Sequence, residues 1–164
     1  MLWLRALIFF VVAPGTVLGF VPYRILRDER RLDAVDGRGA ALAVPLVLAG
    51  IAGLVWCFAL FVRRGHGTPA PYDPPRALVA AGPYRVSRNP MYVCLWLVLA
   101  GEVLATGSGT LAAYALAVVA ATLLFVRLYE EPTLRRQFGV EYDSYCRQVP
   151  RWLGRTRGPA TPAA

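Results

Sequence analysis

Two polar stretches of this sequence carry the residues best suited to chemistry. The first covers residues 82–92 and reads GPYRVSRNPMY. Asn89 followed by Pro90 predicts a helix start, because asparagine caps helices and proline is favoured at the first helical position. A helix start presents free backbone N–H groups and the positive end of the helix dipole. With Arg85 and Arg88 beside it, this end predicts a site for a carboxylate or phosphate, or else an arginine belt that reaches lipid headgroups.

The second polar stretch covers residues 130–151 and begins with two adjacent carboxylates, Glu130 and Glu131. These glutamates follow a long apolar segment, and at the C-terminal end of a helix their charges oppose the helix dipole. Pro132 lacks a backbone N–H and therefore predicts a kink or the start of a new helix. In a new helix Glu131 would lie near the N-terminus, where its charge is favourable.

Beyond Pro132, apolar side chains recur at helical spacing, at Leu134, Phe138, Tyr142 and Tyr145. This period predicts one amphipathic helix at the membrane surface, with charged residues on its opposite face. Such a helix serves either as a surface anchor or as a lid over whatever the two polar stretches bind.

The residue types in the sequence exclude several mechanisms. There is no lysine, so a P-loop nucleotide site and a Schiff-base enzyme are ruled out, and the single histidine, His66, rules out a zinc site of the HExxH type. Cys57, Cys94 and Cys146 are far apart and predict neither disulfides nor a metal site. Carboxylates, arginines and tyrosines suit a zwitterionic or cationic cofactor better than hydrolysis. Methyl transfer from a sulfonium donor is compatible, because it needs mainly positioning and electrostatics.

The elements that must position these residues are expected to be membrane helices. Of the 164 residues, 57% are hydrophobic and 17% are charged, which is too apolar for an ordinary soluble domain. A helix needs about 20 mostly apolar residues to cross a bilayer. Four transmembrane helices are predicted, at about 2–21, 42–62, 91–106 and 110–128. The sequence GSG at 107–109 predicts a tight turn, so the last two spans should form a helical hairpin.

Arginine counts predict the orientation of these spans. The segment between the second and third spans and the tail after the fourth are rich in arginine, so both should face the cytoplasm, with the protein in the inner membrane. The segment between the first two spans has five arginines and four acids and must then lie on the opposite side, which leaves the orientation of the first span open. Topology and anionic headgroups explain the net charge of +8 better than nucleic-acid binding does.

The domain organisation is predicted to be simple, with one all-α membrane domain at 1–154 and a disordered tail at 155–164 that is rich in proline, alanine and threonine. Glu102 lies inside the third span. An acid within a membrane span is a functional candidate, although the short span also allows a solvated position at the interface.

The two polar stretches resemble motifs of the integral-membrane S-adenosylmethionine-dependent methyltransferases, the family of isoprenylcysteine carboxyl methyltransferases and phospholipid N-methyltransferases. That family carries GPYRxxRHPxY before a helical hairpin and EExxLxxxFGxEYxxYxxxVPR after it, so the resemblance covers about the C-terminal half of the chain. It implies S-adenosylmethionine enclosed between the stretches at the cytoplasmic face, and a lipophilic acceptor that enters from the bilayer. The implied acceptor group is the carboxylate or amine of a lipid or lipidated molecule, a small hydrophobic metabolite also remains open, and no metal is implied.

The resemblance also implies roles for individual residues. The implied cofactor-binding residues are Tyr84, Arg88, Asn89, Pro90, Tyr92, Glu130 and Glu131. Catalysis and positioning of the acceptor are implied for Glu130, Arg85 and Arg136. Asn89 stands where the family usually has histidine, and an asparagine does not titrate near neutral pH.

Two other functions remain open at the level of the sequence. Membrane sterol reductases carry a stretch similar to residues 82–92 and bind NADPH, but those enzymes are generally larger, with more spans. The other alternative is a membrane protein that retains the fold without catalysis, which the asparagine at position 89 would suit. Binding of S-adenosylhomocysteine or of NADPH distinguishes these functions.

Overall fold

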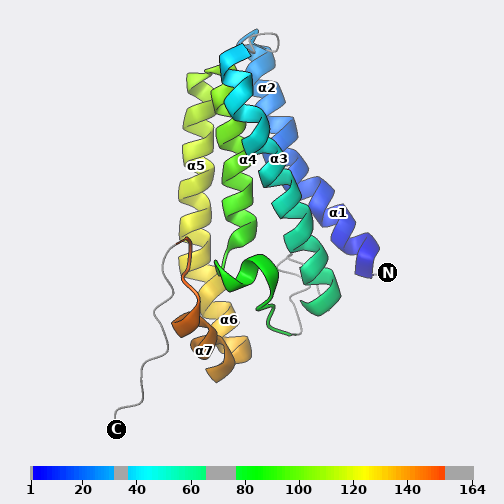
Figure 1. The fold of residues 1–164 in the computed structure, drawn as a ribbon, viewed down its shortest axis with the longest axis vertical. Helices are drawn as coiled ribbons and strands as arrows, with labels where there is room; N and C mark the ends of the chain where they lie inside the picture. The colour runs from blue at the N-terminus through cyan, green and yellow to red at the C-terminus, as the bar shows by residue number, and fades with distance from the viewer. Residues whose placement is uncertain (1, 32–36, 66–76, 154–164) are drawn as a thin grey trace.

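The structure is a computed structural model that describes residues 2–31, 37–65 and 77–153 (Figure 1). Within these ranges the chain is helical, with connecting turns and no strand. The helices are α1 (Leu2–Gly15), α2 (Val21–Asp28), α3 (Gly37–Leu60), α4 (Pro90–Thr106), α5 (Gly109–Phe125), α6 (Glu131–Phe138) and α7 (Val140–Gln148), with a short 3₁₀ helix at Gly82–Arg85. The all-α prediction is therefore confirmed for the described part of the chain.

Three π-helical turns extend or join the helices of the described residues. Thr16–Phe20 joins α1 to α2, Phe61–Gly65 extends α3, and Val126–Glu130 joins α5 to α6. Glu130 is the last residue of the third turn, and α6 begins at the next residue, Glu131. Pro132 occupies the first turn of α6, where its missing N–H costs no helical hydrogen bond, as the sequence predicted.

Two helical stretches, Gly39–Arg64 and Gly109–Phe138, are long and apolar enough to cross a membrane. The predicted spans 42–62 and 110–128 lie within them, while the predicted span 91–106 falls on α4, a shorter apolar helix. Large apolar side chains on these helices point outward, for example Leu48 and Leu116, which are 62% and 70% exposed. Such faces suit contact with lipid chains.

Helices α3 and α4 pack closely because glycine lies at their contacts. A Cβ atom at Gly50 would lie 2.7 Å from the carbonyl oxygen of Cys94, and one at Gly101 would lie 3.0 Å from that of Ala43. Small residues of this kind let membrane helices approach each other closely. The core beside this contact contains Leu54 of α3 and Leu95, Val98 and Leu99 of α4.

Replacing Gly50 with alanine is expected to destabilise the protein by about 1–3 kcal/mol, because the added methyl group would push α3 away from α4. Gly15→Ala provides the matched control, since a Cβ atom there would meet no atom within 4 Å. The measurement is the thermal unfolding midpoint of each purified variant in detergent. Equal midpoints for the two variants would contradict the close contact of α3 with α4.

The turn between α4 and α5 is tied to the end of α2. Ser108 caps α5 by accepting a hydrogen bond from the N–H of Leu111, and its hydroxyl donates to Glu29 at 2.6 Å. This hydrogen bond lowers the pKa of Glu29. Arg31 donates to the carbonyl oxygens of Thr106 and Gly107. The chain from α1 to α2 is thus fastened at this end of the bundle, while α1 diverges from the other helices toward the opposite end (Figure 1).

The prediction of a single amphipathic helix after Pro132 is wrong in one respect. The chain forms two short helices, α6 and α7, that are separated at Gly139, whose φ of +53° and ψ of −124° suit only glycine. The predicted apolar side chains still gather, because Leu134 and Phe138 of α6 pack against Tyr142 and Tyr145 of α7. The break folds α7 back, so that these residues face one another instead of forming one continuous stripe.

Candidate functional site

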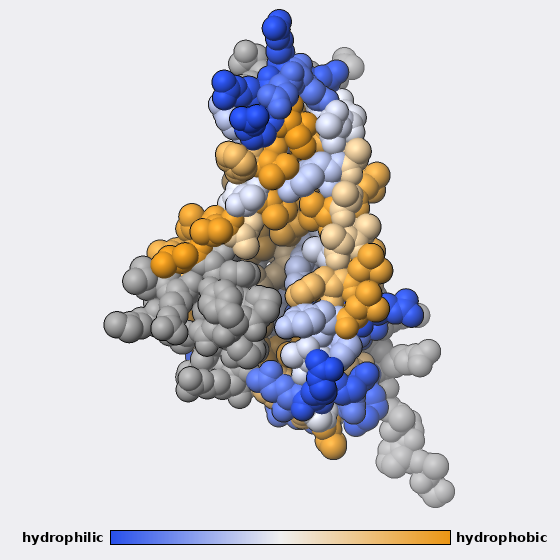
Figure 2. Space-filling view, turned by 180° about the vertical axis from the view of Figure 1, so that it is seen from behind, coloured by the Kyte–Doolittle hydropathy of each residue, from blue (hydrophilic) through white to orange (hydrophobic). Residues whose placement is uncertain are grey.

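A cavity of about 350 Å³ lies at the end of the bundle where α4 begins and α5 ends. Its wall is mostly apolar and comes from α1, α3, α4, α5, α6, α7 and the segment before α4. Figure 2 shows a hollowed face between the diverging part of α1 and α5, with hydrophobic side chains at its margins. The cavity lies between these two segments and extends toward the hollowed face, because it is lined by Ala13 and Pro14 of α1, by Val17 of the π-helical turn after α1, and by Val118, Thr122 and Phe125 of α5.

Six of the predicted site residues lie on the wall of this cavity. They are Tyr84, Arg88, Asn89, Pro90, Tyr92 and Glu130. The two polar stretches of the sequence therefore meet in space, across about 40 residues of chain. The apolar part of the wall, including Leu78, Val79, Met91 and Leu95, had no signal in the sequence beyond general hydrophobicity.

Glu130 is the carboxylate that faces the cavity. One of its oxygens accepts a hydrogen bond from the Tyr92 hydroxyl at 3.0 Å. No arginine of the described residues forms an ion pair with it. A half-buried carboxylate in an apolar wall favours a cationic ligand, because a positive charge would offset the cost of removing the carboxylate from water.

Glu131 has different surroundings from those of its neighbour, although the two glutamates are adjacent in sequence. Its side chain is buried and forms a two-pronged pair with Arg151, with both N–O distances at 2.7 Å. A second arginine, Arg88, lies 3.0 Å away. Glu131 does not line the cavity, so the structure places it behind the wall, as the shared partner of two arginines. Its hydrogen bonds raise the pKa of Arg151.

Arg88 and Tyr84 present unpartnered polar atoms at the cavity. The Nη1 of Arg88 forms an ion pair with Glu131 and donates a hydrogen bond to the Cys146 sulfur at 2.7 Å, whereas its buried Nε has no partner. The buried hydroxyl of Tyr84 has no hydrogen-bond partner either. Burial raises the pKa of this phenol well above its usual range, so it stays protonated and available as a donor. Buried donors without partners indicate positions that a ligand can satisfy.

Asn89 occupies the N-cap position of α4, so the predicted helix start is confirmed, but the expected side-chain cap is wrong. Its side chain makes no cap hydrogen bond and instead donates to the carbonyl oxygen of Arg151 at 2.9 Å. Ser87 accepts a hydrogen bond from the backbone N–H of Asn89, and its own hydroxyl donates to the same Arg151 carbonyl. Asn89 thus joins the start of α4 to the chain after α7.

Residues 149–153, here called the C-terminal strap, complete this end of the bundle. The backbone N–H of Arg88 donates to the carbonyl oxygen of Pro150 at 2.9 Å. The ring of Trp152 packs against that of Trp96 on α4, with centroids 4.6 Å apart, and the Trp96 indole donates to Thr122 on α5. The sequence motif ends at Arg151, but nothing in it predicted that the strap crosses back over α4.

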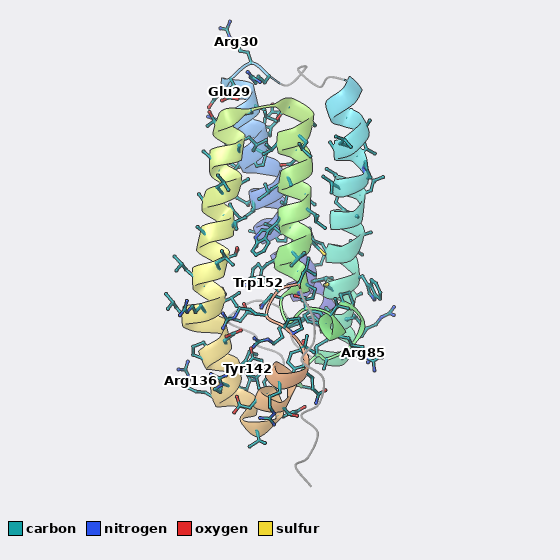
Figure 3. All side chains as sticks on the ribbon, turned by 60° about the vertical axis from the view of Figure 1, so that its left-hand side comes forward. Glu29, Arg30, Arg85, Arg136, Tyr142 and Trp152 are labelled. Carbon is teal, nitrogen blue, oxygen red and sulfur yellow. The ribbon has the colours of Figure 1, made fainter. Side chains whose placement is uncertain are left out.

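Arg85 and Arg136 lie outside the cavity. Both side chains are exposed, and neither lines the cavity wall. Figure 3 shows Arg85 pointing outward from the turn before α4 and Arg136 pointing outward from α6. Arg136 donates to Thr133, one helical turn before it. The structure therefore brings neither of these two predicted acceptor-positioning residues to the predicted cofactor ligands.

The described residues thus define a class of helical protein with apolar helices long enough to cross a membrane and a candidate site in the cavity at one end of the bundle. The sequence model of the phospholipid methyltransferase family matches residues 38–141, and the chain belongs to this family. This membership agrees with the resemblance of the two polar stretches.

A curated relative is the nickel-cobalt-cadmium resistance protein NccN of Alcaligenes xylosoxydans xylosoxydans. It is 34% identical over 103 residues, which are 63% of this chain and 44% of the relative. The chain thus spans less than half the length of that relative. No solved structure matches the chain.

Proposed function

We propose that this protein transfers a methyl group from S-adenosylmethionine to a lipophilic acceptor at the cytoplasmic face of the inner membrane. The observation that carries the proposal is the position of Glu130, a carboxylate on a mostly apolar cavity wall with the Tyr92 hydroxyl as its hydrogen-bond partner. Membership of the phospholipid methyltransferase family supports the reaction class. The arginine-rich segments at the cavity end support a cytoplasmic orientation.

The polar atoms at the cavity fit the amino-acid end of this methyl donor. Glu130 would hold the ammonium group, and the unpartnered Nε of Arg88 would donate to the carboxylate. When bound, S-adenosylmethionine supplies an electrophilic methyl group on a sulfonium. The apolar wall would keep water away from the reacting groups, and the residues of the wall would align donor and acceptor.

The charges at the cavity favour an amine over a carboxylate as the acceptor group. Among the described residues, Arg88 is the arginine on the cavity wall, and Glu131 already compensates its charge. A carboxylate acceptor would meet Glu130 without a free cation to neutralise it, whereas a nitrogen gains positive charge as it is methylated. The hollowed face between α1 and α5 would admit the apolar part of such an acceptor from the bilayer.

Binding of S-adenosylhomocysteine to the purified full chain in detergent tests the donor site. We expect saturable micromolar binding by calorimetric titration and no binding of NADPH, because the cavity lacks the uncompensated arginines that phosphates require. Binding of NADPH alone would contradict the proposal in favour of a reductase. Binding of neither ligand by the folded protein would favour a non-catalytic role.

Transfer of a labelled methyl group to lipids tests the acceptor class. Membranes that contain the protein are supplied with S-adenosylmethionine labelled in its methyl group, and the lipid extract is treated with base. An N-methyl group resists base, whereas a methyl ester releases labelled methanol. The expected result is label that stays on an amine-containing headgroup, although base also hydrolyses the acyl esters of a phospholipid. Labelled methanol would instead show that the acceptor is a carboxylate.

A further inference from the structure

A second hollow lies on the back of the segment that forms the cavity wall. It is an open groove of about 310 Å³ between α3, the turn before α4 and the first turns of α4, and its lining is almost entirely apolar. Trp56, Val86, Val93 and Leu153 contribute to it. Three of them are strongly exposed, at 57% for Trp56, 58% for Val86 and 67% for Leu153. The groove shares Pro90 with the cavity, but it is lined by a separate set of side chains.

The charge beside this groove is positive. Arg85 directly precedes Val86 of the groove, and its side chain is exposed and points away from the bundle (Figure 3). No carboxylate of the described residues lies within ion-pair distance of it, and no acidic side chain lines the groove. At the same end of the bundle, α3 continues into a π-helical turn that carries the exposed Arg63 and Arg64.

The exposed indole of Trp56 indicates the depth of the groove in the membrane. Trp56 lies on α3, about two helical turns before Arg63 of the π-helical turn that extends α3. Tryptophan is favoured at the boundary between hydrocarbon and headgroups, and an arginine two turns further on would reach the phosphate level. The groove would then face the acyl chains of one leaflet, with Arg85 at the level of their headgroups.

From this arrangement we infer that the groove binds an anionic phospholipid, with the phosphate on the guanidinium of Arg85 and one acyl chain against Trp56, Val86 and Val93. The uncompensated positive charge beside an apolar groove selects an anionic lipid over a zwitterionic one. Arg85 thereby has a partner, although it lies outside the cavity. The inference is independent of the methyl-transfer reaction.

Native mass spectrometry of the delipidated full chain in detergent tests this site, with phosphatidylglycerol and phosphatidylcholine as probes. The wild-type chain should prefer phosphatidylglycerol, and Arg85→Gln should reduce that preference about fivefold. Arg147→Gln is the matched control, because Arg147 is also exposed, and lines neither the groove nor the cavity. It removes the same charge and should leave the preference unchanged. Equal losses in both variants would overturn the inference in favour of general attraction.

Filling the groove provides a second test that does not depend on charge. Val86→Trp should abolish the binding of the first phosphatidylglycerol molecule, and Val93→Trp should do the same if the first variant unfolds. The thermal unfolding midpoint and the affinity for S-adenosylhomocysteine identify a variant that remains folded. Unchanged lipid binding in a folded, filled variant would overturn the inference. Equal affinity of the wild-type chain for the two lipids would also overturn the inference. A dimer that the filling substitution dissociates would do the same, since a second copy of the chain would then occupy the groove.

Discussion

Replacing Glu131 with glutamine is expected to lower the free energy of unfolding by about 3–5 kcal/mol, because removing one partner of a buried ion pair leaves the other charge uncompensated. Glu131 is only 9% exposed at its side chain, and it compensates both Arg88 and Arg151. Removing the Glu131 carboxylate would also release the C-terminal strap, which Arg151 holds against α6. The measurement is the thermal or denaturant unfolding midpoint of the purified variant.

Asp143→Asn is the control for this experiment. Asp143 also pairs with an arginine, Arg135 at 2.8 Å, but the two side chains are 44% and 57% exposed. Exposed ion pairs contribute little to stability, because water and salt screen them. A similar loss of stability in both variants would show that burial does not distinguish the Glu131 pair. A stable Glu131→Gln protein that has lost only ligand affinity would return Glu131 to the role of cofactor ligand.

The second large effect is expected at Glu130, on ligand affinity instead of stability. Glu130→Gln should weaken binding of S-adenosylhomocysteine by about 1.5–3 kcal/mol, the contribution of a hydrogen bond to a charged group. The unfolding midpoint should change little, since the carboxylate has one hydrogen bond, from Tyr92, and no ion pair among the described residues. Calorimetric titration of the variant measures the affinity.

Tyr92→Phe is the matched control for Glu130. It removes the hydrogen bond to the carboxylate but leaves the charge in the cavity, so affinity should fall less than in Glu130→Gln. Unchanged affinity in Glu130→Gln would exclude Glu130 as the ligand of the ammonium group. Together the substitutions at 130 and 131 distinguish the expected roles of two adjacent glutamates: Glu130 binds the ligand, and Glu131 holds the cavity wall in place.

The sequence was sufficient to identify the long apolar helices and the two stretches that meet at the cavity, but not α2 or the division between α6 and α7. Long apolar stretches of the sequence predicted the positions of α3 and α5, because hydrophobicity alone is enough to recognise such helices. The motif spacing placed Arg88, Tyr92 and Glu130 together, since the short turn at Gly107 returns α5 alongside α4. Pro132 correctly indicated the start of α6.

Other features of the site depend on the directions of side chains and backbone, which the spacing of residues in the sequence does not specify. Arg85 and Arg88 are three residues apart, yet they lie on opposite sides of the chain, because the segment between them leaves the 3₁₀ helix before α4 begins. Gly139 interrupted an otherwise regular helical period, and its positive φ could not be read from the period itself. The contribution of α1 and the π-helical turn after it rests on Ala13, Pro14 and Val17, which resemble any other apolar residues of a span.

The C-terminal strap also has a consequence for the order in which this site is made. Ribosomal synthesis delivers Arg88 first, Glu131 about 40 residues later, and Arg151 after a further 20. Until Arg151 has been added, Glu131 lacks its closest partner and Asn89 lacks the carbonyl oxygen that it binds. Docking of the strap can therefore take place only after α4 and α5 have both been synthesised, and a nascent chain arrested before residue 151 holds its helices without a finished site.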